Sequence, residues 1–128
     1  MNYKNGVLAN TLESLMKFPD VTGKTGFAIM RNIRILETEL KDFRDARMNL
    51  FKKYGKSEDD GKTYQIGNDD PGYQEFMSEY NKLLDIEIDV SPFRMDASEI
   101  DLQYSEQASV KDYIVVQDFI SNRQGQSE

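Results

Sequence analysis

Hydrophobic residues recur at alternating spacings of four and three between Ile29 and Tyr54. The positions are Ile29, Ile33, Leu36, Leu40, Phe43, Arg47, Leu50 and Tyr54. This spacing places the residues in one line along one side of an α-helix. A helix over residues 29–54 is about 39 Å long, which is about the breadth of a compact domain of this length. The pattern therefore predicts one long central helix, ended by Gly55, around which the rest of the chain packs.

Two further stretches show the same helical spacing over shorter lengths. Residues 6–17 place Leu8, Leu12 and Leu15 on one face, and residues 71–84 do so with Tyr73, Phe76, Tyr80 and Leu83. Asp70 followed by Pro71 predicts the start of the second helix, because Asp is a good N-cap and Pro is favoured at the first helical position. We expect the first helix to cover the N-terminal half of the long helix. The second is expected to fold back antiparallel over its C-terminal half.

An antiparallel hairpin sets a register between residues 71–84 and the long helix. The register places Tyr73 near Tyr54, Phe76 near Leu50, Tyr80 near Arg47 and Leu83 near Phe43. Arg47 then occupies a position where an apolar residue is expected, and burial of an unpaired charge is unfavourable. We therefore predict that its guanidinium reaches Glu79 or the Tyr80 hydroxyl and fixes the register. The alternative is an exposed Arg47 that is presented to a binding partner.

Strand-like alternation follows the second short helix. Leu84, Ile86, Ile88 and Val90 alternate with Asp85, Glu87 and Asp89, which is the period of a half-buried strand. A weaker alternation at Ile100, Leu102 and Tyr104 predicts its partner strand. Asp60-Gly61 and Gly67-Asn68 predict turns on either side of residues 62–66, and thus a small turn or hairpin between the helices.

The C-terminal part predicts one more helix. Ser109 and Asp112 have the spacing of a capping box, which favours a helix over residues 110–121 with Tyr113, Val116 and Ile120 inward. The predicted fold is α+β: a helical hairpin built on one long central helix, with a short N-terminal helix, a small antiparallel β element and a C-terminal helix. With 128 residues, the chain fits a single domain over residues 1–122. The polar residues 123–128 are expected to fray.

The chain contains no cysteine and no histidine. This removes disulfides, thiolate nucleophiles, imidazole bases and nearly all zinc sites, so we expect a protein that is not an enzyme and holds no metal or cofactor. The hydrophobic fraction of 38% and the charged fraction of 30% are typical of a soluble globular protein. The longest apolar runs, residues 27–30 and 113–116, are far shorter than a membrane span. A cytoplasmic protein without membrane contact is therefore expected.

Charge is distributed unevenly along the chain, whose net charge is −7. Residues 24–62 hold ten Lys and Arg against seven Asp and Glu, whereas residues 63–128 hold four against fourteen. The acidic half disfavours direct binding of DNA or RNA and favours a partner with a basic surface. The candidate partner-binding residues on this acidic surface are Asp85, Glu87, Asp89, Asp96, Glu99 and Asp101. A metal site at Asp85, Glu87 and Asp89 is not expected, because same-face neighbours on a strand lie about 6.6 Å apart.

Three stretches resemble one protein family. They read FAIMRNIRILETELKDFRDARMNLFKKYG, KSEDDGKTYQIGNDD and YQEFMSEYNKLLDIEIDV. The most distinctive elements are Lys41-Asp42-Phe43, Arg47, Leu50, Lys53-Tyr54-Gly55 and Asn81-Lys82-Leu83-Leu84-Asp85-Ile86-Glu87. The family consists of small proteins of unassigned function encoded by tailed phages and prophages of Gram-positive bacteria. The resemblance extends to Val90, implies a phage context and supplies no catalytic residues.

Two functions fit these observations. The first is a non-catalytic, phage-encoded inhibitor of a host nucleic-acid-handling defence enzyme, such as a CRISPR effector, acting through its acidic surface in the cytoplasm of the infected host. The second is an accessory protein of the virion tail, the baseplate or virion assembly, whose charge serves solubility. Either role fits a monomer or a homodimer.

Overall fold

The structure, a computed structural model, describes residues 1–122. These residues form five α-helices, one 3-10 helix and four short strands. The helices are α1 (Asn5–Leu15), α2 (Gly23–Glu39), α3 (Lys41–Tyr54), α4 (Tyr73–Asp85) and α5 (Val110–Ile120), with the 3-10 helix η1 at Ala97–Glu99. The strands are β1 (Asn2–Lys4), β2 (Glu87–Asp89), β3 (Met95–Asp96) and β4 (Ser121–Asn122). The predicted α+β class is confirmed, and the tail predicted at residues 123–128 lies outside the described residues.

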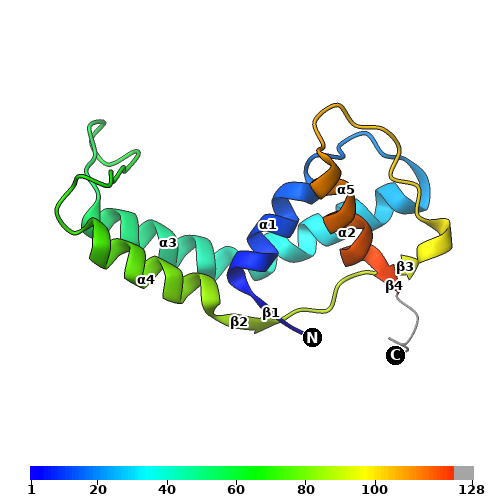
Figure 1. The fold of residues 1–128 in the computed structure, drawn as a ribbon, viewed down its shortest axis with the longest axis horizontal. Helices are drawn as coiled ribbons and strands as arrows, with labels where there is room; N and C mark the ends of the chain where they lie inside the picture. Colours follow the sequence, from blue (N-terminus) through cyan, green and yellow to red (C-terminus); the bar gives the residue numbers. More distant parts are fainter. Residues whose placement is uncertain (123–128) are drawn as a thin grey trace.

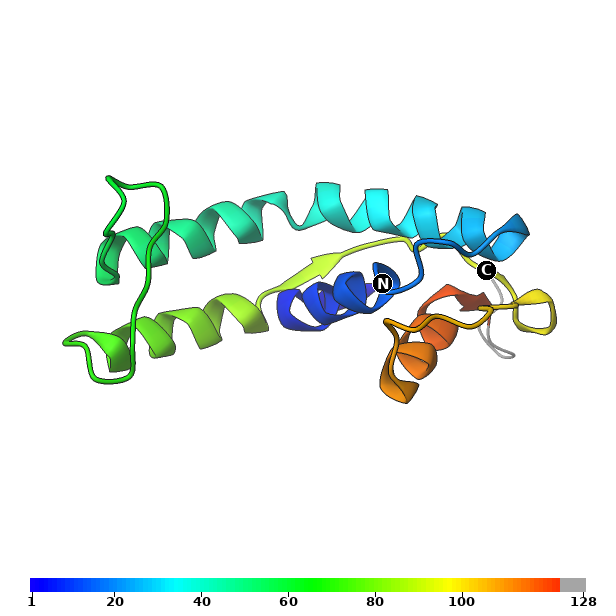
Figure 2. The same cartoon turned by 90° about the horizontal axis from the view of Figure 1, so that it is seen from above.

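The helices divide into two parts, which we call the body and the arm. α1, α2 and α5 pack together in the body, while α3 and α4 with their connecting loop extend from it as an antiparallel hairpin, the arm (Figure 1). In Figure 2, α2 and α3 follow one another along the length of the molecule, with α1 beside α2 and α4 beside α3. The expectation that two shorter helices cover the two halves of a longer helical stretch is thereby confirmed.

The helical stretch over residues 29–54 is divided at Leu40, so the prediction of one uninterrupted helix is wrong. Leu40 has φ −91° and ψ 4°, although its N–H still donates to the Leu36 carbonyl at 2.8 Å. No Pro or Gly lies within residues 27–54, so a helix-breaking residue does not cause the bend. Leu40 is 1% exposed and belongs to the core where body and arm meet. We attribute the bend to this packing against two different sets of partners.

The predicted apolar seam faces inward. Ile29, Leu36, Leu40 and Phe43 are buried, and Leu8, Leu12 and Leu15 of α1 share their core with Val116 and Ile120 of α5. The seam is less covered in the arm, where Arg47, Leu50 and Tyr54 are half-buried. In the arm helices, α3 and α4 each bury a single side chain, Phe43 and Phe76. The arm is therefore a two-helix layer with much of its side-chain surface open to solvent.

A buried asparagine ties the segment after β2 to α2. Asn32 is fully buried on the inward face of α2, between Ile29 and Leu36. Its Nδ2 donates to the carbonyl oxygens of Ala28 at 2.9 Å and Phe93 at 2.8 Å, and its Oδ1 accepts from the Phe93 N–H at 2.8 Å. The side chain thus satisfies both backbone polar groups of Phe93 in place of a neighbouring strand.

The strand predicted around residues 84–90 is present as β2, but its partner is the N-terminal strand β1. The two strands are antiparallel, with Tyr3 opposite Ile88. Backbone bonds extend the contact at both ends: the Asn5 N–H donates to the Ile86 carbonyl and the Val90 N–H to the Met1 carbonyl, each at 2.9 Å. Three residues at the start of the chain thus supply the partner, a run too short to show an alternating pattern.

The strand predicted at residues 100–104 is not formed. Leu102 is buried, but the Asp101 N–H donates to the Thr25 hydroxyl at 2.9 Å, and Gln103 has a φ of +58°. A residue with positive φ interrupts an extended run. The apparent alternation therefore comes from a coil segment that covers the start of α2.

The C-terminal helix begins as predicted. Ser109 and Asp112 form a capping box at the start of α5, and Ser14 of α1 donates to the Asp112 carboxylate at 2.7 Å. Val116 and Ile120 are fully buried, as expected from the pattern. The next two residues, β4, pair in parallel with β3.

The helix predicted to begin at Pro71 begins at Tyr73 instead. Gly72 precedes it with a φ of +86°, a left-handed conformation that favours glycine. The Asp70 carboxylate accepts from the Gly67 N–H at 2.8 Å, so it closes the preceding turn and does not cap the helix. Pro71 therefore belongs to the turn.

Candidate functional site

The six candidate acidic residues form two groups, so the single acidic surface expected from the sequence is divided. Asp85, Glu87 and Asp89 lie at the end of α4 and on β2, where the arm meets the body. Asp96, Glu99 and Asp101 lie around η1, near the start of α2. Figures 1 and 2 both show β2 and η1 well apart along the molecule. We call the residues at β2 the junction group and those around η1 the η1 group.

Two of the three junction-group carboxylates have partners within the chain. Asp85 lies 3.6 Å from the Lys4 Nζ, and Asp89 lies 2.5 Å from the amino group of Met1. Glu87 is exposed, and within residues 1–122 its carboxylate forms no ion pair or hydrogen bond. Exposed ion pairs are weak and screened by salt, but they reduce the local negative charge. Glu87 is therefore the carboxylate of this group that is best placed to meet a partner.

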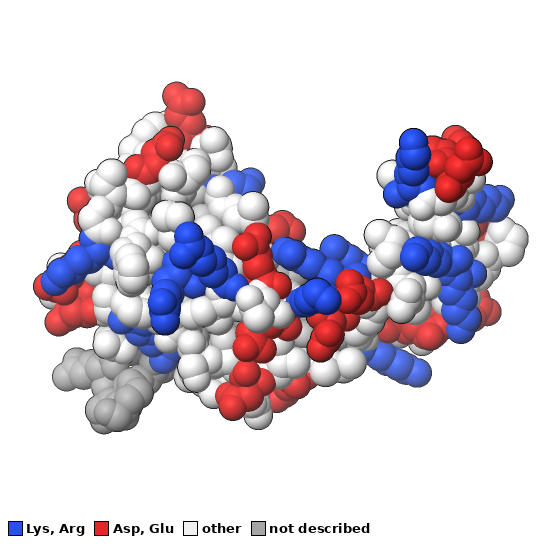
Figure 3. Space-filling view, turned by 180° about the vertical axis from the view of Figure 1, so that it is seen from behind, with Lys and Arg blue, Asp and Glu red and all other residues white. Residues whose placement is uncertain are grey.

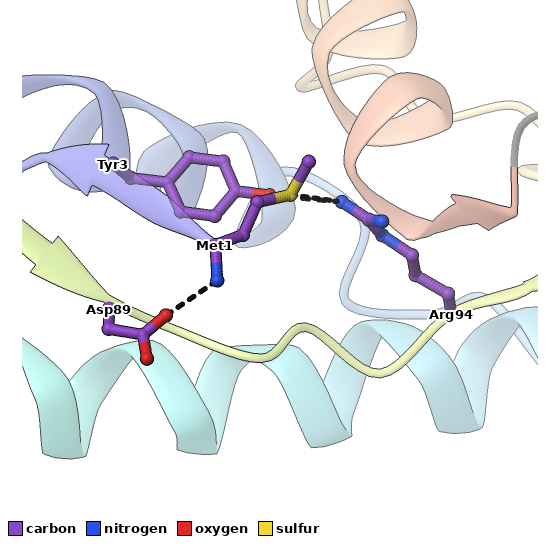
Figure 4. A network of polar contacts seen from close by, with 4 residues as sticks. All are labelled: Met1, Tyr3, Asp89 and Arg94. Carbon is purple, nitrogen blue, oxygen red and sulfur yellow. Dashed lines mark hydrogen bonds and ion pairs between the residues drawn. The ribbon is translucent and has the colours of Figure 1, made fainter. Parts of the chain in front are cut away.

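A polar network around Met1 fixes the backbone beneath the junction group. Figure 4 shows Met1 between Asp89 and Arg94. The Arg94 Nη2 donates to the Met1 sulfur at 3.3 Å and to the Tyr3 hydroxyl at 3.0 Å. The Tyr3 ring also packs on Phe119 of α5, with 5.8 Å between ring centroids. The junction group is thus displayed on a strand pair that is anchored to the body.

The η1 group stabilises local structure. Asp96 caps η1 by accepting from the Ser98 N–H at 2.9 Å, a bond that holds the pKa of Asp96 below its ordinary value. Asp101 accepts from the Gln103 N–H at 3.2 Å, and Glu99 lies 3.3 Å from the Lys24 Nζ. All three carboxylates therefore have partners within residues 1–122: Asp96 and Asp101 in their own segment, and Glu99 on α2.

The predicted contact from Arg47 to Glu79 or Tyr80 is wrong. The Arg47 guanidinium lies over the Phe43 ring, 5.4 Å from its centroid. Arg47 is only half-buried, so its charge keeps contact with water and the ring supplies a cation–π contact in place of an ion pair. Tyr80 and Arg47 both line a groove on the surface of the arm. The prediction erred because it assumed that the seam stays buried along the arm.

Glu79 instead accepts a hydrogen bond from Tyr54, and this contact joins the two helices of the hairpin. The Tyr54 hydroxyl donates to the Glu79 carboxylate, and the Lys53 Nζ lies 3.5 Å from it. The Phe76 ring packs against the rings of Phe51 and Tyr54, with centroid distances of 5.0 and 6.3 Å. The bond from Tyr54 lowers the pKa of Glu79, and the bond to Glu79 raises the pKa of Tyr54.

We expect Tyr54→Phe to raise the pKa of Glu79 toward its ordinary value, because the donor that stabilises the carboxylate is removed. A lowered acid pKa stabilises the fold at neutral pH, and this contribution is lost as the pH falls through the folded-state pKa. The raised pKa of Tyr54 stabilises the fold below pH of about 10, and this contribution is lost as the pH rises through its folded-state pKa. Carboxyl-carbon NMR titration measures the pKa of Glu79 in the Tyr54→Phe variant and in the unaltered protein. Tyr73→Phe, at the start of α4, is the control and should leave Glu79 unchanged; equal titration of Glu79 in both variants would refute the contact.

A groove on the arm brings three cationic side chains together. It has a volume of about 610 Å³, and its principal lining residues are Arg44, Arg47, Met48 and Phe51 of α3, Lys62 of the loop and Tyr80 of α4. Figure 3 shows this loop standing away from the body with a hollow beside it, and blue and red side chains mixed over the face. Arg44 is not among the candidate partner-binding residues predicted from the sequence, although residues 44, 47, 48 and 51 have the spacing of one helical face.

The loop that forms one wall of the groove is held by Asp59. The Asp59 carboxylate accepts from the Thr63 N–H at 2.8 Å and from the Thr63 hydroxyl at 2.6 Å, and these bonds lower the pKa of Asp59. Lys56 and Gln65 form two backbone hydrogen bonds of 2.8 and 2.9 Å across the base of the loop. The turn predicted for this stretch is thereby confirmed, with Asp60 and Gly61 at positive φ.

No protein-family model, curated protein or solved structure matches this chain. Within residues 1–122, no three or more Asp and Glu side chains are grouped so as to hold a metal ion. No helix in this part of the chain is long and apolar enough to cross a membrane.

Proposed function

We propose that this is a non-catalytic, phage-encoded protein that acts in the cytoplasm of the infected host. In this proposal it inhibits a nucleic-acid-handling defence enzyme, such as a CRISPR effector, by placing the junction group on a basic surface that otherwise binds phosphates. The phage context rests on the resemblance of residues 27–90. The proposed contact with the basic surface of the enzyme rests on the geometry of the junction group.

The observation that carries the proposal is the exposed Glu87 on an anchored strand. Asp89 lies two residues on in β2 and Asp85 two residues back at the end of α4, so five consecutive residues hold three exposed carboxylates. Opposite charges across an interface raise the association rate and select the partner. The ion pair between Asp85 and Lys4 is exposed and therefore weak. Basic side chains of the partner can thus compete with Lys4 for the Asp85 carboxylate.

We expect Glu87→Lys to weaken inhibition of a purified host CRISPR effector nuclease. A charge reversal at an exposed contact should raise the concentration for half-maximal inhibition of DNA cleavage about tenfold. The effect should shrink as salt increases, because screening weakens the contact of the unaltered protein as well. Cleavage assays at low and high salt with the full-length protein provide the measurement.

Glu75→Lys is the matched control, since Glu75 is an exposed carboxylate on α4 away from the junction group. It makes the same change in net charge and should inhibit as well as the unaltered protein. Equal loss in both variants would assign the effect to total charge, and equal inhibition by all three proteins would exclude the junction group as the contact.

A second candidate, a virion tail, baseplate or assembly protein, is favoured by the shape of the arm. A second groove of about 420 Å³ lies on the arm, with Leu50, Leu83 and Ile86 among its lining residues, and Ile86 is 52% exposed. Open apolar surface on a projecting hairpin suits permanent assembly with other proteins. Stoichiometric amounts of the protein in purified virions would support this function over inhibition.

A further inference from the structure

The cationic groove on the arm is a surface separate from the junction group and opposite to it in charge. We propose that this groove binds a short acidic segment of a partner protein, with carboxylates facing Arg44, Arg47 and Lys62 and an apolar side chain lying on Met48 and Phe51. The proposal goes beyond the inhibitory function, which uses the junction group and a basic partner.

Charge on the groove favours an acidic ligand. Arg44, Arg47 and Lys62 line it together with one acidic residue, Asp45. Asp45 lies 3.7 Å from the Lys41 Nζ, so part of its charge is already balanced. The groove is therefore a cationic site on a protein whose net charge is −7. Arginine at two of the three positions favours carboxylates, because its planar fork of donors matches their geometry.

The apolar part of the groove consists of residue types that are enriched at protein interfaces. Met48 is 45% exposed, and Phe51, Tyr64 and Tyr80 are half-buried. Arg, Tyr, Phe and Met are over-represented in interface cores, where aromatic and Arg side chains supply much of the binding energy. A ligand with an apolar side chain between its carboxylates would cover this surface, whereas a simple anion would not.

Contacts within the chain hold both walls of the groove. One wall is the rigid helix α3, and the other is the loop held by the Asp59 carboxylate and the Lys56–Gln65 bridge. A preformed wall reduces the entropy lost on binding. Ordering of the loop by its own hydrogen bonds therefore supports recognition of a defined segment.

A peptide fits the groove better than a nucleic acid does. Glu58, Asp59 and Asp60 are exposed on the same loop, and the junction group lies at the other end of the arm. A long polyanion that follows the arm would meet these carboxylates. A short segment of a few residues contacts the groove alone and avoids them.

The test begins with selection from a random ten-residue peptide display library on the immobilised full-length protein. The selected peptides should be enriched in Asp and Glu with an aromatic or aliphatic residue between them. Selection of peptides without acidic enrichment would overturn the proposal, as would an absence of selected peptides.

Fluorescence anisotropy with a selected, labelled peptide then locates the site. Arg44→Glu should raise Kd about tenfold, because it reverses a charge that faces the ligand. The Arg44 side chain is exposed and forms no hydrogen bond or ion pair with the rest of residues 1–122, so this variant should fold normally. Lys62→Glu, on the loop, provides a second variant with the same expected direction.

Arg34→Glu is the matched control, since Arg34 is an exposed arginine on α2 in the body. It should leave Kd unchanged, and equal weakening by Arg34→Glu and Arg44→Glu would overturn the assignment to the groove. A fifteen-nucleotide oligothymidine that displaces the peptide with equal affinity would show a nucleic-acid site instead. Arg44→Glu should also retain inhibition of the nuclease, so failure of this proposal and failure of the inhibitory function are distinguishable.

Discussion

Asn32→Asp is expected to destabilise the protein by about 4 kcal/mol at neutral pH. The carboxylate would face the carbonyl oxygens of Ala28 and Phe93, which now accept from the Asn32 Nδ2 at 2.9 and 2.8 Å. It would also place a charge at a site with no solvent exposure. Because globular proteins are stable by only about 5–15 kcal/mol, a large part of the free energy of unfolding would be lost. Urea unfolding followed by circular dichroism gives this free energy.

The loss should diminish in acid. Protonation removes the buried charge, so the penalty grows as the pH rises above the ordinary aspartate pKa of about 3.9 and shrinks as the pH falls toward it. Asn49→Asp, an exposed position on α3, is the matched control and should change stability by less than about 0.5 kcal/mol. If Asn32→Asp and Asn49→Asp unfold alike at pH 7, the Asn32 side chain does not hold the Phe93 segment.

Gly26→Ala is expected to destabilise the protein by about 3 kcal/mol, although Ala is favoured over Gly in a helix by about 1 kcal/mol. An added Cβ would lie 2.8 Å from the carbonyl carbon of Val21 and closer still to its oxygen. Both atoms belong to the backbone, so no side-chain rotation relieves the contact. Gly26 is also buried at the start of α2, where the chain from α1 returns to the core. Urea unfolding with far-ultraviolet circular dichroism measures the loss.

Gly23→Ala separates this clash from the general effect of replacing a glycine. Gly23 has a φ of +70° and no atom within 4 Å of an added Cβ, so its replacement should cost about 1 kcal/mol through backbone conformation alone. A smaller loss for Gly26→Ala than for Gly23→Ala would contradict the close approach of Val21.

The sequence predicts the helices well because helical periodicity is a strong local signal. Leu36 and Phe43 belong to the predicted seam and are buried, and the capping box at Ser109 is formed. The bend at Leu40 has no local signal, since it arises from tertiary packing. The pairing of β2 with β1 also escapes prediction, because residues 2–4 are too few to carry a period.

The site residues were less predictable than the fold. Sequence places Glu87 and Asp96 in one acidic stretch, but it does not show that they lie at different ends of the body or that Ser98 engages Asp96. Asn32 follows the inward spacing of Ile29 and Leu36, so its burial was detectable, but its partner Phe93 is 61 residues away. The cationic groove depends on a loop that folds back toward α3, which composition alone does not reveal.

The register of the arm hairpin is the central claim, because it positions the junction group and the cationic groove alike. Aromatic NOE spectroscopy of the full-length protein tests it most directly. We predict cross-peaks from the Phe76 ring on α4 to the rings of Phe51 and Tyr54 on α3, whose centroids lie 5.0 and 6.3 Å away. Cross-peaks from Phe76 to Ile29 or Leu36 in place of these, or random-coil shifts throughout residues 73–85, would contradict it.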